Sequence, residues 1–179
     1  MAVPEYEVFA VKYAHHDRRA RENFLGGDPH DAPMPLDYYV WLVRGHGREI
    51  VVDTGFSAEM ARKRGRALLR CPTEGLALLG CDAARVRDVV VTHLHYDHAG
   101  NFDRFPEATL HVQDREVQYA TGRYMCHDCF RGAFEVEDVV AMVRRVYAGR
   151  VRFHDGDAEL APGVSLHHIG GHTLGLQVV

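Results

Sequence analysis

The residue types best suited to chemistry lie in one six-residue segment, which starts at His93 and reads HLHYDH. It directly follows the apolar run 89–91, which is typical of a buried strand. Side chains alternate faces in an extended segment, so His93 and His95 point the same way. A turn after His95 can then bring Asp97 and His98 back towards them. The spacing therefore predicts a metal site.

These donors favour a pair of adjacent metal ions. Neutral imidazole suits zinc, copper, iron and nickel, and a carboxylate extends the choice to manganese. One tetrahedral zinc could not use all four side chains and keep a position open for water. Two ions could, with His93 and His95 on the first and Asp97 and His98 on the second. The alternative is chance clustering on a solvated loop, because the chain has 13 histidines.

Three segments together resemble the metallo-β-lactamase superfamily. The HxHxDH pattern at 93–98, following a strand, resembles its metal-binding signature, and VVDTG at 51–55 is similar to its second-strand motif. GGHT at 170–173 resembles the segment that supplies a third histidine to the first metal. The resemblance implies that His172 joins the first two histidines on one ion. It also implies that Asp53 lies beneath the metal loop, where it can accept a hydrogen bond from a metal-binding histidine.

A finer resemblance concerns function. The segments LDYY at 36–39 and DHAGNF at 97–102 look most like the N-acyl-homoserine lactonases of that superfamily. This implies a metal-dependent hydrolase, with zinc as cofactor, in which metal-activated water opens a lactone and Asp97 is both ligand and catalytic residue. No serine or cysteine nucleophile is required. The alternatives are a thioester hydrolase resembling hydroxyacylglutathione hydrolase and a non-catalytic metal-binding fragment.

The end of the sequence departs from the family pattern. Relatives continue past the third histidine to a metal-bridging aspartate and a last histidine, whereas this sequence ends at Val179. Residues 176–179 read as the start of a strand, and unpaired strand edges invite association. We therefore expect a truncated chain with an incomplete second sheet, low activity and marginal stability. The second metal site, held by Asp97 and His98 alone, is expected to be weak.

Composition limits the class of protein. The 179 residues are 46% hydrophobic and 26% charged, which predicts one folded domain over 1–179. The formal charge of −4 argues against nucleic acid as a partner. The sequence shows neither a leader peptide nor a membrane span. We therefore expect a soluble cytoplasmic protein with a small-molecule substrate, and we leave open that it forms a homo-oligomer.

The Cys126-His127-Asp128-Cys129 segment has two interpretations. A Cys-x-x-Cys pair can bind structural zinc or exchange disulfides. Zinc needs four ligands, however, and the sequence has no second Cys-x-x-Cys pair. We therefore favour incidental thiols in a flap near the active site.

Strands and helices are expected to alternate along the chain. Strands are predicted at 6–13, 38–44, 49–53, 86–92, 109–112, 151–153 and 164–169. Helices are predicted at 58–69 with Ser57 as N-cap, at 73–79 with Thr73 as N-cap, at 114–121 and at 136–148. This order indicates an α/β layered fold. The family resemblance implies a four-layer αββα sandwich with metals at the edge between its sheets, which periodicity alone does not distinguish from a doubly wound sheet.

Several segments keep alternative interpretations. The loop at 14–37 could lie near the site with Phe24, Leu25 and Met34 at a substrate entrance, or these side chains could form a small packing cluster. The basic stretch 62–66 could meet an anionic partner, although a solvated helix face is favoured. Among the remaining histidines, those in strand-like segments are expected to pack or to support metal ligands; they are His111, His167 and His168.

Overall fold

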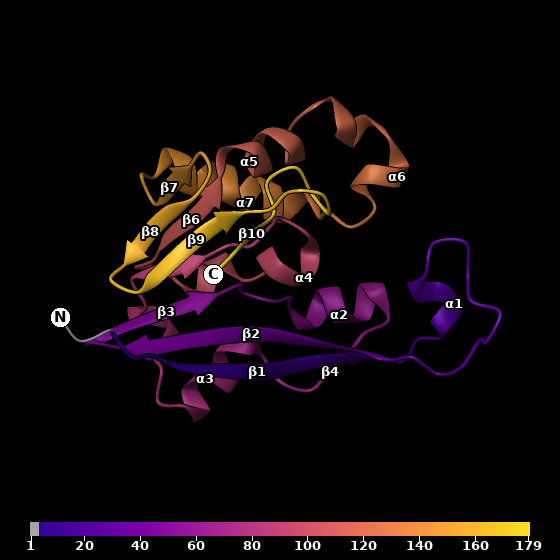
Figure 1. Ribbon diagram of the computed structural model, residues 1–179, viewed down its shortest axis with the longest axis horizontal. Coiled ribbons are helices and arrows are strands. Elements are labelled where there is room, and N and C mark those ends of the chain that lie inside the picture. The colour runs from indigo at the N-terminus through magenta and orange to yellow at the C-terminus, as the bar shows by residue number, and fades with distance from the viewer. Residues whose placement is uncertain (1–3) are drawn as a thin grey trace.

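Segments rich in valine and aromatic residues form the strands, in keeping with the preference of these residues for extended backbone. In the computed structural model, which describes residues 4–179, the strands make two sheets (Figure 1). The larger sheet has the order β4-β1-β2-β3-β5-β6-β7. Its strands are β1 (Glu7–His16), β2 (Leu36–Gly45), β3 (Arg48–Val52), β4 (Ala67–Leu68), β5 (Asp88–Val90), β6 (Thr109–Gln113) and β7 (Val151–His154). The smaller sheet has the order β10-β9-β8, and its strands are β8 (Ala158–Ala161), β9 (Val164–His168) and β10 (Gln177–Val178).

The helices are short. They are α1 (Ala20–Asn23), α2 (Ala58–Arg64), α3 (Pro72–Leu78), α4 (Tyr96–Ala99), α5 (Asp114–Ala120), α6 (Asp128–Arg131) and α7 (Val136–Tyr147). Three 3-10 turns accompany them: η1 (Ala83–Arg85), η2 (Phe102–Arg104) and η3 (Arg123–Cys126). Within residues 4–179, none of the helices has the length and apolar character needed to cross a bilayer.

The core has two parts because both faces of the larger sheet are buried. On β3, Val51 faces the helices and joins the cluster that includes Leu76 of α3 and Met142 of α7. Ile50 and Val52 face the other way and pack with side chains of the smaller sheet, namely Ala161, Val164 and Leu166. Helices, large sheet and small sheet are thus stacked in three layers of an αββα sandwich. The expectation of an α/β layered fold is confirmed.

The direction of the central strands decides where loops can meet. Strands β3, β5, β6 and β7 are parallel neighbours, with Val52 opposite Val90 and Val90 opposite His111. Their carboxyl ends therefore lie along one edge of the sheet, which is where ligands commonly bind in parallel α/β sheets. The segment that follows β5 and contains the HLHYDH sequence begins at this edge.

The predicted helix at 58–69 is too long. Ser57 does cap it, since its hydroxyl accepts a hydrogen bond from the backbone N of Met60. The helix ends at Gly65, which adopts the left-handed conformation with φ of 63° and donates back to the last turn. Residues 67–68 then form β4, which pairs with β1. Glycine favours this kind of helix end because it lacks a Cβ.

Other element boundaries also differ from the prediction. The helix expected at 73–79 starts at Pro72, and Cys71, rather than Thr73, occupies the N-cap position. Proline fits the first helical position because its missing N–H would have no partner there. Strand β8 was not predicted from the sequence. Its four residues are held by antiparallel pairing with β9, which local sequence does not reveal.

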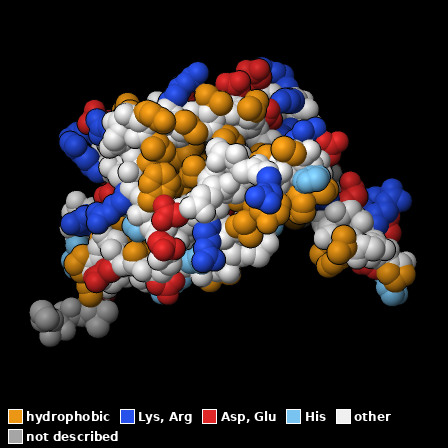
Figure 2. All heavy atoms as spheres, turned by 90° about the horizontal axis from the view of Figure 1, so that it is seen from above, with side chains coloured by type: hydrophobic (Ala, Val, Ile, Leu, Met, Phe, Trp, Pro, Cys, Tyr) orange, Lys and Arg blue, Asp and Glu red, His pale blue; other side chains and the backbone are white. Residues whose placement is uncertain are grey.

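The loop predicted at 14–37 forms an arm, which we define as residues 17–35. Strand β1 continues to His16 and β2 begins at Leu36, so the arm is shorter than predicted and includes α1. Figures 1 and 2 show it standing off one end of the molecule, with apolar and charged side chains exposed on it. The three apolar residues Phe24, Leu25 and Met34 are all exposed, so the packing cluster does not form. A role at a substrate entrance stays a prediction.

Candidate metal centre

Two histidines are presented by the extended chain that leaves β5. Leu94, between them, is completely buried in the main core, so the flanking side chains turn away from that core. The ring centroids of His93 and His95 lie 4.6 Å apart, and both residues are buried. His95 also occupies the N-cap position of α4 with extended backbone. The prediction that both imidazoles share one face is confirmed.

A third histidine comes from the loop after β9. Gly170 and Gly171 adopt φ of 68° and 88°, which side-chain-bearing residues rarely tolerate, and this turn presents His172. The His172 ring centroid is 4.9 Å from that of His93 and 4.7 Å from that of His95. One ligand nitrogen from each of the three residues lies within 4.8 Å of the others. Tertiary structure thus brings together the three residues assigned to the first ion.

The three imidazoles fit a divalent metal. The Nε2 atom of His93 is buried and has no hydrogen-bond partner within residues 4–179, while Nδ1 lies 3.1 Å from Thr92 Oγ1. An unpaired buried nitrogen is costly unless something else binds it. Burial and the neighbouring imidazoles lower the pKa of His93 to about 2, and burial and His172 lower the pKa of His95 to about 4. Both rings are therefore neutral at physiological pH, as metal binding requires.

Asp97 and His98 lie on α4 beside this group. The His98 Nε2 atom is 3.4 Å from Asp97 Oδ2, and the ring centroid of His98 is 4.0 Å from that of His93. Burial lowers the pKa of His98, but the carboxylates of Asp53 and Asp97 outweigh it and raise that pKa to about 10. Burial raises the pKa of Asp97, but the hydrogen bond and the charge of His98 outweigh burial and lower that pKa to about 2. Without a metal, protonated His98 and ionised Asp97 thus form an ion pair where the second ion was predicted, and a metal that binds there would displace the proton from His98 Nε2.

The Asp53 carboxylate hydrogen-bonds both His98 and the backbone of the segment that carries the histidines. Its Oδ2 atom accepts a hydrogen bond from His98 Nδ1 at 2.6 Å, and Oδ1 accepts from the backbone N of Thr92 at 2.8 Å. It adopts φ of 64°, a conformation that aspartate tolerates better than most residues. The structure thus places the Asp53 carboxylate under the metal loop, as the sequence resemblance implied. A carboxylate on Nδ1 leaves Nε2 free for a metal.

Three contacts to the site were missed by sequence reasoning. Tyr13 donates its hydroxyl to the backbone carbonyl of Asp97 at 2.7 Å. The Phe134 ring packs edge-on against His95 with centroids 4.6 Å apart. Glu116, which is fully buried on α5, hydrogen-bonds the two loops that carry the histidines. No spacing in the sequence indicates these contacts, since each joins segments distant along the chain.

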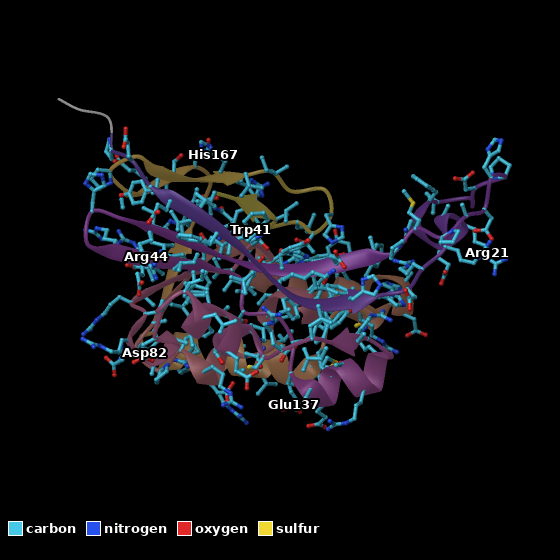
Figure 3. All side chains as sticks on the ribbon, turned by 90° about the horizontal axis from the view of Figure 1, so that it is seen from below. Arg21, Trp41, Arg44, Asp82, Glu137 and His167 are labelled. Carbon is cyan, nitrogen blue, oxygen red and sulfur yellow. The ribbon has the colours of Figure 1, made fainter. Side chains whose placement is uncertain are left out.

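The other candidate residues lie outside the site. Cys126 and Cys129 are exposed free thiols, and neither belongs to a metal-binding group within residues 4–179. His111 is buried between Asp88 and His154, and His167 lies on the small sheet (Figure 3).

The basic stretch at 62–66 is more than a solvated helix face. The Arg64 guanidinium lies 3.9 Å from the centroid of the Tyr96 ring and donates to the carbonyls of Gly132 and Phe134. Arg66 donates to the Tyr96 hydroxyl at 3.1 Å. Arg64 and Arg66 therefore connect α2 and the residues after it to segments beside the metal group, whereas Arg62 and Lys63 are exposed, so the solvated helix face describes only part of the stretch.

Comparisons with known proteins agree with this geometry. A family model described as Metallo-beta-lactamase superfamily matches residues 34–179. The N-acyl homoserine lactonase AttM of Azorhizobium caulinodans is 57% identical over 107 residues, which cover 52% of this chain and 39% of that protein. The N-acyl homoserine lactonase AiiB of Agrobacterium fabrum is 29% identical over 161 residues, covering 80% of this chain and 56% of that protein. The chain thus spans well under two thirds of the length of these relatives.

A solved structure shows the same fold. It is an N-acyl homoserine lactone hydrolase with the product N-hexanoyl-L-homoserine at its catalytic metal centre. Its TM-score with this chain is 0.72, at 21% sequence identity, covering 99% of this chain and 70% of that one.

Proposed function

Because the chain belongs to the metallo-β-lactamase superfamily, we propose that it provides the metal-binding part of a hydrolase that opens N-acyl-homoserine lactones. The observation that carries the proposal is the group of His93, His95 and His172, with a buried, unpaired Nε2 on His93. The relatives that are named as lactonases support the choice of substrate. We further propose zinc as the ion, because three histidines with an open fourth position are typical of catalytic zinc.

Each residue of the site has a distinct task in this proposal. His93, His95 and His172 hold the first ion, and Asp97 with His98 provides ligands for a second. Such ions, when bound, supply a nucleophile from water at neutral pH and polarise the lactone carbonyl. The Asp97 side chain is partly exposed, so its carboxylate can orient the attacking water. Asp53 keeps the His98 Nδ1–H engaged, so that Nε2 faces the ions.

Metal content tests the first step. The protein is purified without an affinity tag, and the metal bound per chain is measured by elemental analysis. We expect about one equivalent or more of a zinc-class metal, and a loss of most of it in His172→Ala. His167→Ala is the matched control, because His167 lies on the preceding strand and hydrogen-bonds Asp157 and Ser165 instead. A folded protein that stays metal-free in metal-supplemented medium rules out the proposal.

Substrate preference tests the second step. Ring opening of N-hexanoyl-L-homoserine lactone releases a proton, which a pH indicator follows in weak buffer. An acyl thioester is assayed in parallel with a thiol reagent. We expect lactone turnover by metal-loaded protein to exceed thioester turnover. The reverse ratio would favour a thioester hydrolase, and metal binding without either activity would favour a metal-binding fragment.

A further inference from the structure

We propose that Glu116 is a positioning residue, whose carboxylate fixes the two histidine-bearing loops relative to each other. The proposal rests on the metal site proposed above. Glu116 lies on α5, is 0% exposed, and does not itself belong to the metal-binding group. Its Oε1 atom accepts from the backbone N of Leu94 at 2.8 Å. Its Oε2 atom accepts from Thr173 Oγ1 at 2.6 Å and from the backbone N of Gly175 at 3.0 Å.

The partners of this carboxylate adjoin all three histidines. Leu94 lies between His93 and His95, and Thr173 directly follows His172. Each carboxylate oxygen therefore holds a different loop, and any movement of one loop against the other stretches these bonds. Gln177 also joins the same segments, since its backbone N donates to the carbonyl of Thr92 at 3.0 Å and its Nε2 atom to that of Val91 at 2.9 Å, but it lies farther from the histidine on the second loop.

Burying a carboxylate is costly unless its oxygens are hydrogen-bonded. Three donors from two loops offset this cost for Glu116. An apolar residue could fill the same space, yet it would leave two buried backbone N–H groups without partners. The arrangement thus meets the geometric needs of a rigid ligand set, in which supporting groups set the orientation of the metal-binding residues.

The close approach at Gly175 supports the same conclusion. A Cβ built at this position would lie 2.2 Å from the backbone N of Glu116 and 2.4 Å from its Cβ. Only glycine therefore lets the loop that carries His172 rest directly on the first turn of α5. The loop is held by contact as well as by hydrogen bonds.

The isosteric change Glu116→Gln separates positioning from simple packing. A glutamine side chain has one acceptor oxygen and one NH₂ donor. The backbone N–H groups of Leu94 and Gly175 both donate, so either orientation of the amide places its NH₂ against one of them. The variant keeps its volume but cannot accept from the backbone N–H groups of Leu94 and Gly175 at the same time, so one of these two links is lost. Thr173→Val removes one donor and leaves the Gly175 N–H in place, so its effect is smaller, whereas Thr173→Ser retains the hydroxyl.

The experiment measures metal affinity and ligand geometry in the folded protein. The metal-free protein is titrated with zinc against a chromophoric chelator, and with cobalt to record its visible absorption bands. For Glu116→Gln we expect roughly ten- to hundredfold weaker zinc binding and altered cobalt bands. Thr173→Val should show a smaller loss, and Thr173→Ser should bind as the wild type does. Glu107→Gln is the matched control, since it makes the same chemical change at an exposed glutamate.

Thermal unfolding of the metal-free proteins completes the test. If Glu116→Gln melts earlier but binds zinc with unchanged affinity and unchanged cobalt bands, Glu116 is only structural and the proposal is wrong. If Glu116→Gln does not fold, the two Thr173 variants decide, and equal zinc affinity in both overturns the proposal. Wild-type protein that binds no zinc would refute the proposed metal site itself. In that case, unchanged hydrogen exchange at the Leu94 and Gly175 amides in Glu116→Gln would refute the loop-fixing role separately.

Discussion

Asp138, which is not part of the metal group, provides a test of the electrostatics of the fold. It lies in the first turn of α7, and its Oδ2 atom is buried without a hydrogen-bond partner among residues 4–179. Burial and the neighbouring carboxylate of Glu135 raise the pKa of Asp138 from 3.8 to about 7, although Arg64 opposes the shift. The folded chain thus keeps a proton on Asp138 at a pH where the unfolded chain has lost it.

The sign of the pH dependence follows from proton uptake on folding. Between the unfolded pKa of 3.8 and the folded pKa of about 7, folding takes up a proton, so stability falls as the pH rises. Above that range Asp138 is ionised in both the folded and the unfolded chain, and the full free-energy cost of burying its charge remains. A difference of about three pH units has a ceiling of about 4 kcal/mol. Because the side chain is partly exposed, screening reduces this, and we expect about 1–2 kcal/mol.

Asp138→Asn should therefore stabilise the protein near pH 8 and change little near pH 4.5. Urea unfolding of both proteins at about these two pH values gives the difference in unfolding free energy. Groups elsewhere titrate equally in both proteins, so the difference isolates Asp138. Glu137→Gln is the control, because Glu137 loses the same charge from the same helical turn at the surface (Figure 3). An equal effect of Asp138→Asn at both pH values would refute the reasoning.

Two further predictions concern the site and its packing. Asp97→Asn keeps the side-chain shape but removes the charge that faces His98, so we expect at least about a hundredfold loss of lactonase rate while the protein still folds; retained activity in metal-loaded protein would contradict the mechanism. Gly175→Ala should lower the unfolding free energy by about 1–3 kcal/mol or more, because the added Cβ would overlap the backbone of Glu116. Gly132→Ala, where the nearest atom to a new Cβ lies at 3.3 Å, is the comparison for that measurement, and equal losses in the two variants would show that the overlap is relieved.

The local sequence was sufficient to predict that two of the three grouped histidines lie together, and the family resemblance added the third, His172. In HLHYDH, the alternation of an extended chain decides that His93 and His95 share a face, and this depends on neighbouring residues alone. The glycines before His172 likewise indicate a turn that other residues rarely adopt. The strands of the large sheet other than β4 could also be predicted, because valine-rich runs carry their preference locally.

Predictions failed where a distant partner decides the outcome. The helix expected at 58–69 ends at Arg64, because Gly65 caps it and residues 67–68 pair with β1. Strand β8 exists because β9 provides its hydrogen bonds, and its own four residues have no strong strand preference. In both cases the free energy of pairing outweighs the local preference of the chain.

Only the tertiary structure decided how the ligands are held. The parallel register of β3 and β5 places Asp53 under His98, and the packing of α5 places Glu116 between Leu94 and Gly175. Sequence resemblance pointed to Asp53, but nothing in the sequence pointed to Glu116. A ligand is recognisable from its side-chain chemistry and short-range spacing, whereas a supporting carboxylate acquires its role from hydrogen bonds to backbone groups that any residue type could provide.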